Sequence, residues 1–377
     1  MLKSSSFKLS LTVALFYFFY FAMVGVYVIF MPKVLKDLGY NAVEIGAIYT
    51  SAPLMRFILP FIFKRYITLT NKVFITALVS TFIITVAFFL TIKNFYLHLF
   101  INLAFGGAMG AVLPFVETIA LKYIGKERYG KVRLWGSIGF ALVAFILAKF
   151  LDSYIIALVF LITTSAFTML FGLFLAQYNL SNTKQEEENN KEFSLEKYWG
   201  FWISIFLFQL SFGGFYNFFT IYESSYGVSL DYISYLWIFG VVCEIVMLIF
   251  QGPLLKNFNL LTLINFTILV TTLRWLIVAL FPQNLLLIAL SQSLHAFSFA
   301  LNYSAVIAYV YTLYPQKKLA QQFLLGVGFG LGGALGALIS GIIYKYSPTG
   351  LFIFEAVVAF ISFIFLFIHQ KRKEKLA

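Results

Sequence analysis

The sequence predicts an all-α membrane protein with twelve transmembrane helices in two pseudo-symmetric six-helix bundles. Three observations predict it: the composition, twelve long apolar stretches, and a weak repeat on either side of a polar linker. Of the 377 residues, 61% are hydrophobic and 11% are charged. A soluble domain is about 45–50% apolar and about 25% charged, so this composition excludes a cytosolic enzyme and a disordered protein. The single cysteine, Cys243, also excludes a disulfide-stabilised secreted protein.

Each apolar stretch is long enough to cross a bilayer as a helix. About 20 residues at 1.5 Å per residue span roughly 30 Å of hydrocarbon. The twelve stretches run over residues 9–31, 42–63, 72–91, 96–121, 134–151, 154–177, 199–222, 232–252, 258–281, 284–313, 319–344 and 349–369. The first is too long for a signal peptide. Because the runs are continuous rather than alternating, a β-barrel is excluded.

The distribution of basic residues predicts the orientation. The N-terminal tail, the loops after even-numbered stretches and the C-terminal tail hold 20 of the 27 Lys and Arg residues. Loops rich in Lys and Arg stay in the cytoplasm, so both termini are expected there, in a multi-pass protein of the inner (plasma) membrane. The net charge of +12 is thus an orientation signal, and no nucleic-acid partner is expected.

A polar segment divides the chain into two halves. Residues 178–198 contain Glu186, Glu187, Glu188 and two asparagines, which is typical of a solvated linker. We therefore expect an N-terminal six-helix bundle at 1–177, a cytoplasmic linker at 178–198 and a C-terminal six-helix bundle at 199–377.

The two halves share a spacing of glycines. Gly25 and Gly39 are 14 residues apart, as are Gly213 and Gly227, and the offset between the pairs is 188 residues. Each pair ends at a turn followed by a helix-capping residue, and Asn41 with Glu44 is typical of a capping box. A six-span repeat around a linker is the signature of transporters whose halves rock about a site at the membrane midplane.

Glycines in the fifth and eleventh spans predict close helix packing. The fifth span carries Gly136 and Gly139, and the eleventh carries six glycines between residues 326 and 336. Small residues let membrane helices approach closely. The packing can be static, or it can belong to a moving interface between the halves.

Ionisable side chains inside the apolar stretches are the functional candidates, because a charge in the membrane is costly. They are Arg56 in span two, Glu117 in span four, Glu244 in span eight, Arg274 in span nine and His295 in span ten, with Asn302 and Tyr303 two turns beyond His295.

Other interpretations exist for some of these residues. Arg56 could bond backbone carbonyls near Pro53 and Pro60 or take part in gating or substrate binding. Glu117 could pair with Lys122 or the basic loop that follows, and Glu355 in span twelve could bond locally. Three ionisable residues on three successive spans, Glu244, Arg274 and His295, favour function.

The chemistry of these three residues indicates proton coupling. A carboxylate whose arginine contact changes between two conformations binds a proton reversibly. Histidine titrates near neutrality, so His295 could carry a proton or bond the substrate. Arginine binds carboxylates well, so Arg274 could bind an anionic substrate.

The motifs resemble a known family over nearly the whole chain. They are the aromatic run Phe16 to Phe21, Leu38-Gly39-Tyr40, Ile45-Gly46, Pro53-Leu54-Met55-Arg56, Leu113-Pro114 with Glu117, Tyr129 to Phe140 around Arg133, Gly240 to Ile245 with Glu244, Leu273-Arg274-Trp275 and Leu294 to Phe297 with His295. With these the sequence resembles the major facilitator superfamily, and within it the phenylpropionate permease branch, related to lactose permease-type proton symporters.

The resemblance implies twelve helices, alternating access, proton-coupled uptake, and roles for Glu244, Arg274 and His295 in a central cavity. One departure matters. Lactose permease-type proteins have an acid three residues after this histidine, where this chain has Ser298. We therefore assign proton coupling to Glu244, with His295, and substrate binding to Arg274, His295, Asn302 and Tyr303. Gating or structural candidates are Arg56, Glu117, Arg133, Gly136 and Gly139.

The expected function is secondary active transport of a small organic solute, with an aromatic or other carboxylic acid favoured. Its partners are the solute, a proton and the lipid bilayer, and the protein is expected to be a monomer without cofactor or metal. A proton symporter for sugars or nucleosides remains an alternative, as do an efflux antiporter and a membrane receptor. The three histidines are dispersed and no phosphate-binding loop occurs, so a membrane enzyme and an ATP-driven pump are disfavoured.

Overall fold

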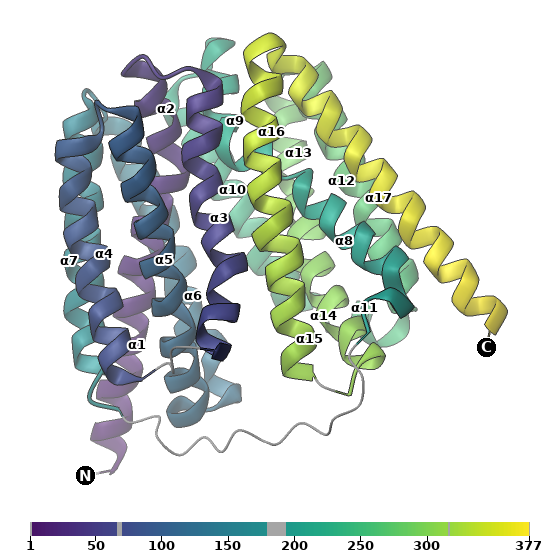
Figure 1. Ribbon diagram of the computed structural model, residues 1–377, viewed down its shortest axis with the longest axis horizontal. Coiled ribbons are helices and arrows are strands. Elements are labelled where there is room, and N and C mark those ends of the chain that lie inside the picture. Colours follow the sequence, from purple (N-terminus) through teal and green to yellow (C-terminus); the bar gives the residue numbers. More distant parts are fainter. Residues whose placement is uncertain (1, 66–69, 179–193, 316, 377) are drawn as a thin grey trace. The chain divides into compact units, whose positions relative to one another are not determined.

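The computed structural model describes residues 2–65, 70–178, 194–315 and 317–376, and these ranges are helical without a strand (Figure 1). The α-helices are α1 (Leu2–Gly25), α2 (Met31–Asp37), α3 (Ala42–Arg65), α4 (Asn71–Thr91), α5 (Phe95–Ile119), α6 (Lys126–Phe150), α7 (Tyr154–Leu175), α8 (Trp199–Leu210), α9 (Gly213–Ser225), α10 (Leu230–Phe250), α11 (Gly252–Asn257), α12 (Leu260–Leu280), α13 (Leu285–Ser293), α14 (Asn302–Leu313), α15 (Lys317–Phe323), α16 (Gly333–Tyr346) and α17 (Pro348–Leu376). The π-helical segments are η1 (Val26–Phe30), η2 (Ala120–Ile124), η4 (Ala296–Leu301) and η5 (Leu324–Gly332), and η3 (Glu196–Tyr198) is a 3-10 turn. Residues 179–193, most of the predicted linker, lie outside the described residues.

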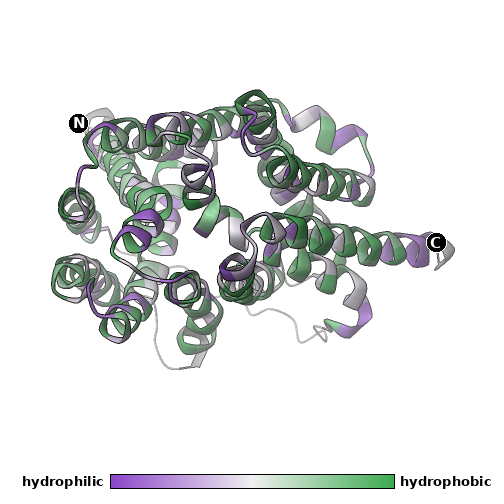
Figure 2. Ribbon diagram, turned by 90° about the horizontal axis from the view of Figure 1, so that it is seen from above, coloured by the Kyte–Doolittle hydropathy of each residue, from purple (hydrophilic) through white to green (hydrophobic). Residues whose placement is uncertain are grey.

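The twelve predicted spans are confirmed. Within the described ranges, twelve helical segments are long and apolar enough to cross a membrane, and they match the predicted stretches one for one. Large apolar side chains such as Leu90 and Leu286 are 84% and 80% exposed, which suits contact with lipid rather than water. In Figure 2 hydrophobic colour runs along the helices, while the chain end marked C is hydrophilic.

Three predicted boundaries were wrong by more than four residues. The first span continues to Asp37 rather than residue 31, the fifth begins at Arg128 rather than residue 134, and the twelfth ends at Glu374 rather than residue 369. Polar residues extend these helices past their apolar stretches. Lys33 pairs with Asp37 one turn away at 2.7 Å, and Arg133 lies inside α6 rather than in a loop. Charges that pair along a helix or lie on aromatic rings therefore do not end it.

Side-chain caps fix several helix starts. Asn41 and Glu44 form the predicted capping box, because each side chain accepts the other residue's backbone N–H, at 2.9 and 3.0 Å. Asn94 caps α5 by accepting from the Leu97 amide at 3.1 Å, and Asn284 caps α13 by accepting from Leu287 at 3.2 Å.

The repeated glycines occupy equivalent turns. Gly39 and Gly227 both have positive φ, 94° and 85°, a conformation that glycine adopts without strain. Each turn is followed two residues later by the residue whose backbone carbonyl accepts the first helical hydrogen bond, Asn41 in one half and Ser229 in the other. The local repeat predicted from sequence is therefore present at these turns.

By backbone contacts the chain divides into two compact units. One comprises Met1–Lys184 with Ser229–Ile238, and the other comprises Gln185–Val228 with Phe239–Ala377. The predicted bundle boundaries at 177 and 199 remain a prediction.

In the first unit, α1 packs directly on α6. A Cβ atom placed on Gly139 would lie 2.0 Å from the backbone oxygen of Phe18, and one on Gly136 would lie 2.6 Å from the Phe21 ring. Only glycine permits this approach of the two helices. The predicted close packing in the fifth span is thus observed.

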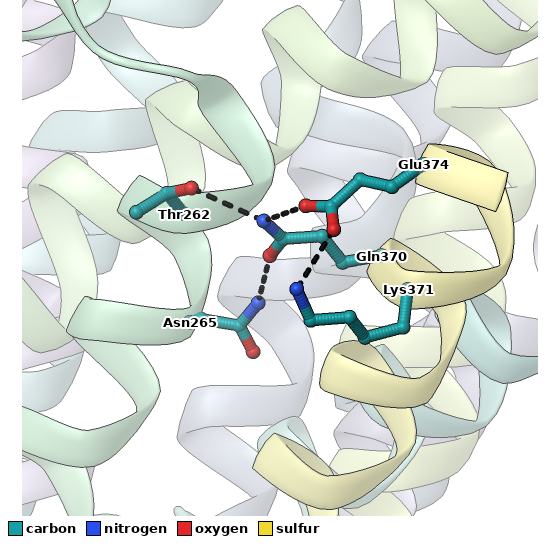
Figure 3. Close-up of polar contacts among 5 residues, drawn as sticks. All are labelled: Thr262, Asn265, Gln370, Lys371 and Glu374. Carbon is teal, nitrogen blue, oxygen red and sulfur yellow. Dashed lines mark hydrogen bonds and ion pairs between the residues drawn. The ribbon is translucent and has the colours of Figure 1, made fainter. Parts of the chain in front are cut away.

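In the second unit, α12 and α17 are joined by a polar cluster near one end (Figure 3). Gln370 accepts a hydrogen bond from Asn265 at 2.8 Å and donates to Thr262 at 3.2 Å. It also donates to Glu374, which pairs with Lys371 at 2.8 Å. These bonds hold α17 beside α12, the helix that carries Arg274.

Candidate functional site

Arg274 is the centre of a polar cluster in the second unit. Its side chain is fully buried, with 0% exposure, on α12. It donates to His295 Nδ1 at 3.0 Å, to Ser298 Oγ at 3.1 Å and to Gln292 Oε1 at 3.2 Å. All three partners lie on one span and none is a carboxylate. Arg274 is therefore a buried cation whose hydrogen-bond acceptors among the described residues carry no negative charge.

A break in helical geometry places the three partners on one side. Gln292 lies near the end of α13, His295 precedes the π-helical segment η4, and Ser298 lies within η4. A π-helical segment widens the turn and is often found at functional sites. Here it lets Gln292, His295 and Ser298, which follow one another at intervals of three residues, all face Arg274. Gln292 and Ser298 were not predicted as site residues; their spacing around His295 was the available signal.

His295 links Arg274 to Glu244. Its Nδ1 atom meets an arginine N–H, which can only donate, so Nδ1 accepts and the ring proton belongs on Nε2. Nε2 lies 3.5 Å from the Glu244 carboxylate on α10. The Glu244 side chain is 22% exposed, whereas that of His295 is 9% exposed. The three ionisable residues predicted from sequence are thus brought into one chain in the order Arg274, His295, Glu244.

Aromatic rings enclose the cluster. The Arg274 guanidinium lies 4.2 Å from the Phe215 ring centroid and 4.6 Å from that of Trp275, so its charge meets two π systems. Phe299 stacks on His295 at 5.2 Å with an interplanar angle of 10°. These rings fix the planes of the guanidinium and the imidazole and keep the surroundings apolar.

The seventh span is interrupted beside this cluster. Helix α8 ends at Leu210 and α9 restarts at Gly213, which exposes new backbone N–H groups. The fully buried Glu355 of α17 accepts from the amides of Gly214 and Phe215. A carboxylate at a helix N-terminus is stabilised by the aligned peptide dipoles. Glu355 therefore bonds another helix rather than groups near it in the sequence, and it is the acid whose charge acts on Arg274.

The remaining two substrate candidates lie further along the same span. Asn302 is buried and donates to Thr267 of α12 at 2.8 Å. The Tyr303 ring is parallel to that of Phe299 at 6.4 Å and meets Phe329 edge-on at 5.5 Å. Their substrate roles remain proposals, and the Asn302 amide already joins two helices.

The gating or structural candidates of the first unit form a separate group. Tyr129 donates to Glu117 at 3.4 Å, and the Arg133 guanidinium lies 3.9 Å from the Phe21 ring centroid. The charge of Arg133 also acts on Glu117. Aromatic contacts with α1 therefore hold Arg133 in place, next to the glycines that bring the two helices together.

Arg56 lies within the second span and is exposed at the surface of the protein. Helix α3 runs from Ala42 to Arg65 through both Pro53 and Pro60, so the prolines do not end it. A gating or substrate role for Arg56 remains a prediction.

One buried acid was missed. Glu223 on α9 is fully buried, and neither of its carboxyl oxygens has a hydrogen-bond partner among the described residues. Its place four residues before Gly227 is typical of an ordinary helix end, so the sequence alone gives no sign of its burial.

Comparison with known proteins now decides the family. The model of the MFS_1-like family matches residues 10–354. The chain belongs to this family. It is an integral membrane transporter of the major facilitator superfamily and not an enzyme, as the sequence predicted.

Individual relatives agree with this assignment. The chain is 24% identical over 359 residues to "Probable 3-phenylpropionic acid transporter" of Escherichia coli strain K12, covering 92% of this chain and 94% of the relative. It is 24% identical over 348 residues to "Uncharacterized transporter YwbF" of Bacillus subtilis strain 168, covering 88% and 86%. The crystal structure of the nucleoside transporter NupG has the same fold, with a TM-score of 0.80 and 17% identity over 96% of this transporter and 99% of that chain. The predicted fold is confirmed.

Proposed function

We propose that this transporter takes up a small organic anion, an aromatic or other carboxylic acid, together with a proton. The observation that carries the proposal is the fully buried Arg274, whose hydrogen-bond partners in the described chain are neutral while His295 connects it to Glu244. A buried guanidinium without a hydrogen-bonded anion is costly, and a solute carboxylate bound to it would reduce that cost. The phenylpropionic acid relative supports a solute of this class.

The flanking rings favour a solute with an apolar body. Phe215, Trp275 and Phe299 lie around Arg274 and His295, so a carboxylate at Arg274 would have aromatic surfaces beside it. Such a site combines one fixed charge with apolar walls, as ligand sites commonly do.

Proton coupling follows from the tautomer of His295. While Glu244 is ionised, the ring proton on Nε2 points at Glu244 and Nδ1 accepts from Arg274. A protonated Glu244 instead donates to Nε2, so the ring proton must move to Nδ1, where it opposes the N–H groups of Arg274. Arg274 then loses an acceptor and turns to the solute carboxylate. Proton binding thereby promotes anion binding, which is the coupling that symport requires.

Orientation and assembly complete the proposal. The Lys and Arg bias supports cytoplasmic termini in the inner (plasma) membrane, because basic loops resist translocation. The transport cycle proceeds by alternating access, and each chain works as a monomer, since the proposed site is built from the second unit alone.

Glu244→Gln tests the coupling. In proteoliposomes with an inward proton gradient, the wild type should accumulate 3-phenylpropionate, and Glu244→Gln should lose accumulation but retain exchange. A glutamine amide donates permanently to His295 and so imitates the protonated state. Glu374→Gln, on the exposed end of α17, is the matched control and should accumulate normally. Normal accumulation by Glu244→Gln would show that the proton binds elsewhere.

The solute class is tested separately by thermal stabilisation of the purified protein. Carboxylates should stabilise it, and their amides should not, because an amide cannot neutralise Arg274. Stabilisation by a nucleoside or a sugar and not by any carboxylate would replace the anion proposal with a neutral-solute symporter.

A further inference from the structure

Glu223 is a second acidic group of unusual environment in the second unit. It lies in the last turn of α9, away from Arg274, and its exposure is 0%. Neither carboxyl oxygen has a hydrogen-bond partner within the described ranges, and the neighbouring Ser224 hydroxyl is likewise buried and unpaired. The described residues also place no Lys, Arg or His at ion-pair distance from it.

The phenols around Glu223 are committed to other groups. On its own helix, the Tyr222 hydroxyl bonds backbone carbonyls of Val278 and Ala279 on α12. The Tyr226 hydroxyl, just past the end of α9, bonds Thr349 on α17. From α16, Tyr344 bonds Ser225. These phenols are neutral groups and provide no cation.

On α16, Lys345 follows Tyr344; it lies over the Tyr346 ring and forms no ion pair with Glu223 among the described residues. The ionisable groups of α12 and α17 that contact α9 lie near the start of that helix. Arg274 of α12 stacks on Phe215, and Glu355 of α17 bonds the amide of Gly214. Since α9 rises 1.5 Å per residue, the eight or nine residues between these contacts and Glu223 separate them by roughly 12 Å. Glu223 therefore lies outside the chain of Arg274, His295 and Glu244.

The internal repeat shows that the matching position in the other half is apolar. The offset of 188 residues that aligns Gly227 with Gly39 aligns Glu223 with Leu35. Leu35 is 1% exposed in the core of the first unit. Compared with a leucine, a buried carboxyl group costs desolvation energy and gains no apolar packing. A structural role therefore does not explain Glu223.

We propose that Glu223 is a proton-binding site, separate from Glu244, that carries a proton in this conformation and releases it to water during the transport cycle. An isolated buried carboxylate is far costlier than a neutral carboxyl, so the group in this environment is the protonated acid. Release requires only that water reach the Gly227 end of α9, where Glu223 lies less than one turn from the helix terminus. The proposal depends on the chain being a transporter and not on the identity of its solute.

Glu355 provides a matched comparison. It is equally buried, yet it accepts backbone N–H groups and lies within the field of Arg274, whereas the carboxyl oxygens of Glu223 have no partner among the described residues. The two glutamates therefore differ in their polar partners and not in their burial.

Infrared spectroscopy of the full chain in liposomes tests the assignment. At about pH 7, where exposed glutamates are ionised, the wild type should show the C=O stretch of a protonated carboxyl group. Glu223→Gln should lose the part of this band that Glu223 contributes, and Glu355→Gln should keep that part. A wild type without the band, or a Glu223→Gln spectrum that retains it in full, would overturn the proposal.

A transport measurement tests release. The pH dependence of solute exchange should change in Glu223→Gln while binding of the solute at saturating concentration persists; an unchanged pH profile would refute a role in the cycle. If the glutamine variant fails to fold, Glu223→Leu, which restores the residue of the repeat, serves instead. Sodium is tested by thermal unfolding in sodium chloride and in choline chloride. If only sodium chloride stabilises the wild type, and this effect is lost in Glu223→Gln, the site binds sodium and the proton proposal is rejected. If Glu244→Gln still accumulates the solute, the proposed function is contradicted, but the proton site at Glu223 is not affected.

Discussion

At the scale of single residues, the polar cluster depends on the geometry of one guanidinium. Arg274 donates to three acceptors on one span and lies against two aromatic rings. Only a planar group with several fixed N–H donors can make all of these contacts together. The charge alone would not be sufficient.

Replacing Arg274 by lysine tests this dependence. A lysine ammonium keeps the charge but cannot stack or reach all three acceptors, so solute affinity should fall by about 10- to 100-fold, or roughly 1.4–3 kcal/mol. Isothermal titration of the purified protein measures the loss. Arg372→Lys, the same substitution at an exposed residue of α17, should leave affinity unchanged. Equal affinity in Arg274→Lys and the wild type would mean that only the charge is needed.

At the scale of elements, the spans that carry the site are discontinuous. The seventh span restarts at Gly213, the tenth contains η4 beside His295, and the eleventh contains the glycine-rich η5. Each interruption frees backbone groups or re-aims side chains, which uniform helices cannot do. Glycines then let the neighbouring helices come close. A Cβ atom placed on Gly213 would lie 2.2 Å from the backbone carbonyl carbon of Gly336.

Gly139→Ala measures the importance of this close packing. Its Cβ would overlap the Phe18 backbone, which cannot move aside as a side chain can, so the free energy of unfolding should fall by about 1–3 kcal/mol. Thermal unfolding in detergent is the measurement. Gly130→Ala in the same helix meets nothing within 4 Å and should be neutral or stabilising. Similar melting temperatures for both variants would contradict a packing role for Gly139.

At the scale of the whole molecule, the orientation in the membrane is set by charge. The apolar spans make insertion favourable but are indifferent to direction, and the Lys and Arg bias supplies the preference. Cys243 is the single cysteine of the chain, so its removal gives a clean background for labelling.

Single cysteines test the orientation. In a Cys243→Ser background, Asp152→Cys, in the loop between α6 and α7, should react with a membrane-impermeant maleimide added outside intact cells. Glu374→Cys at the end of α17 should react only after the cells are opened. Both positions are exposed in the structure. The reverse pattern would place the termini outside the cytoplasm.

Much of this molecule could be predicted from the sequence because the relevant physics is local. A run of apolar residues determines a span, the Asn41 and Glu44 pair determines a helix start, and Gly39 and Gly227 determine turns. Each depends only on residues close in the chain. The ends of the first and fifth spans were wrong because Lys33 and Arg133 are accommodated by contacts that hydropathy does not record.

The site was only partly predictable for the opposite reason. Sequence indicated that Glu244, Arg274 and His295 belong together, since three charges on successive spans are costly apart. It could not give their order, because the position of His295 between the other two depends on how η4 turns against α12 and α10. It also missed Glu223, whose burial is produced by helices that are distant from it in the sequence.

The sequence by itself therefore determined the twelve membrane helices, the repeated turns and the family, because hydropathy and backbone preference act over a few residues. The tertiary structure alone decided which charges are compensated. Glu355 faces the start of α9, His295 lies between Arg274 and Glu244, and Glu223 has no partner in the described chain. Charge compensation is a property of distances between helices, and those distances exist only once the chain has packed.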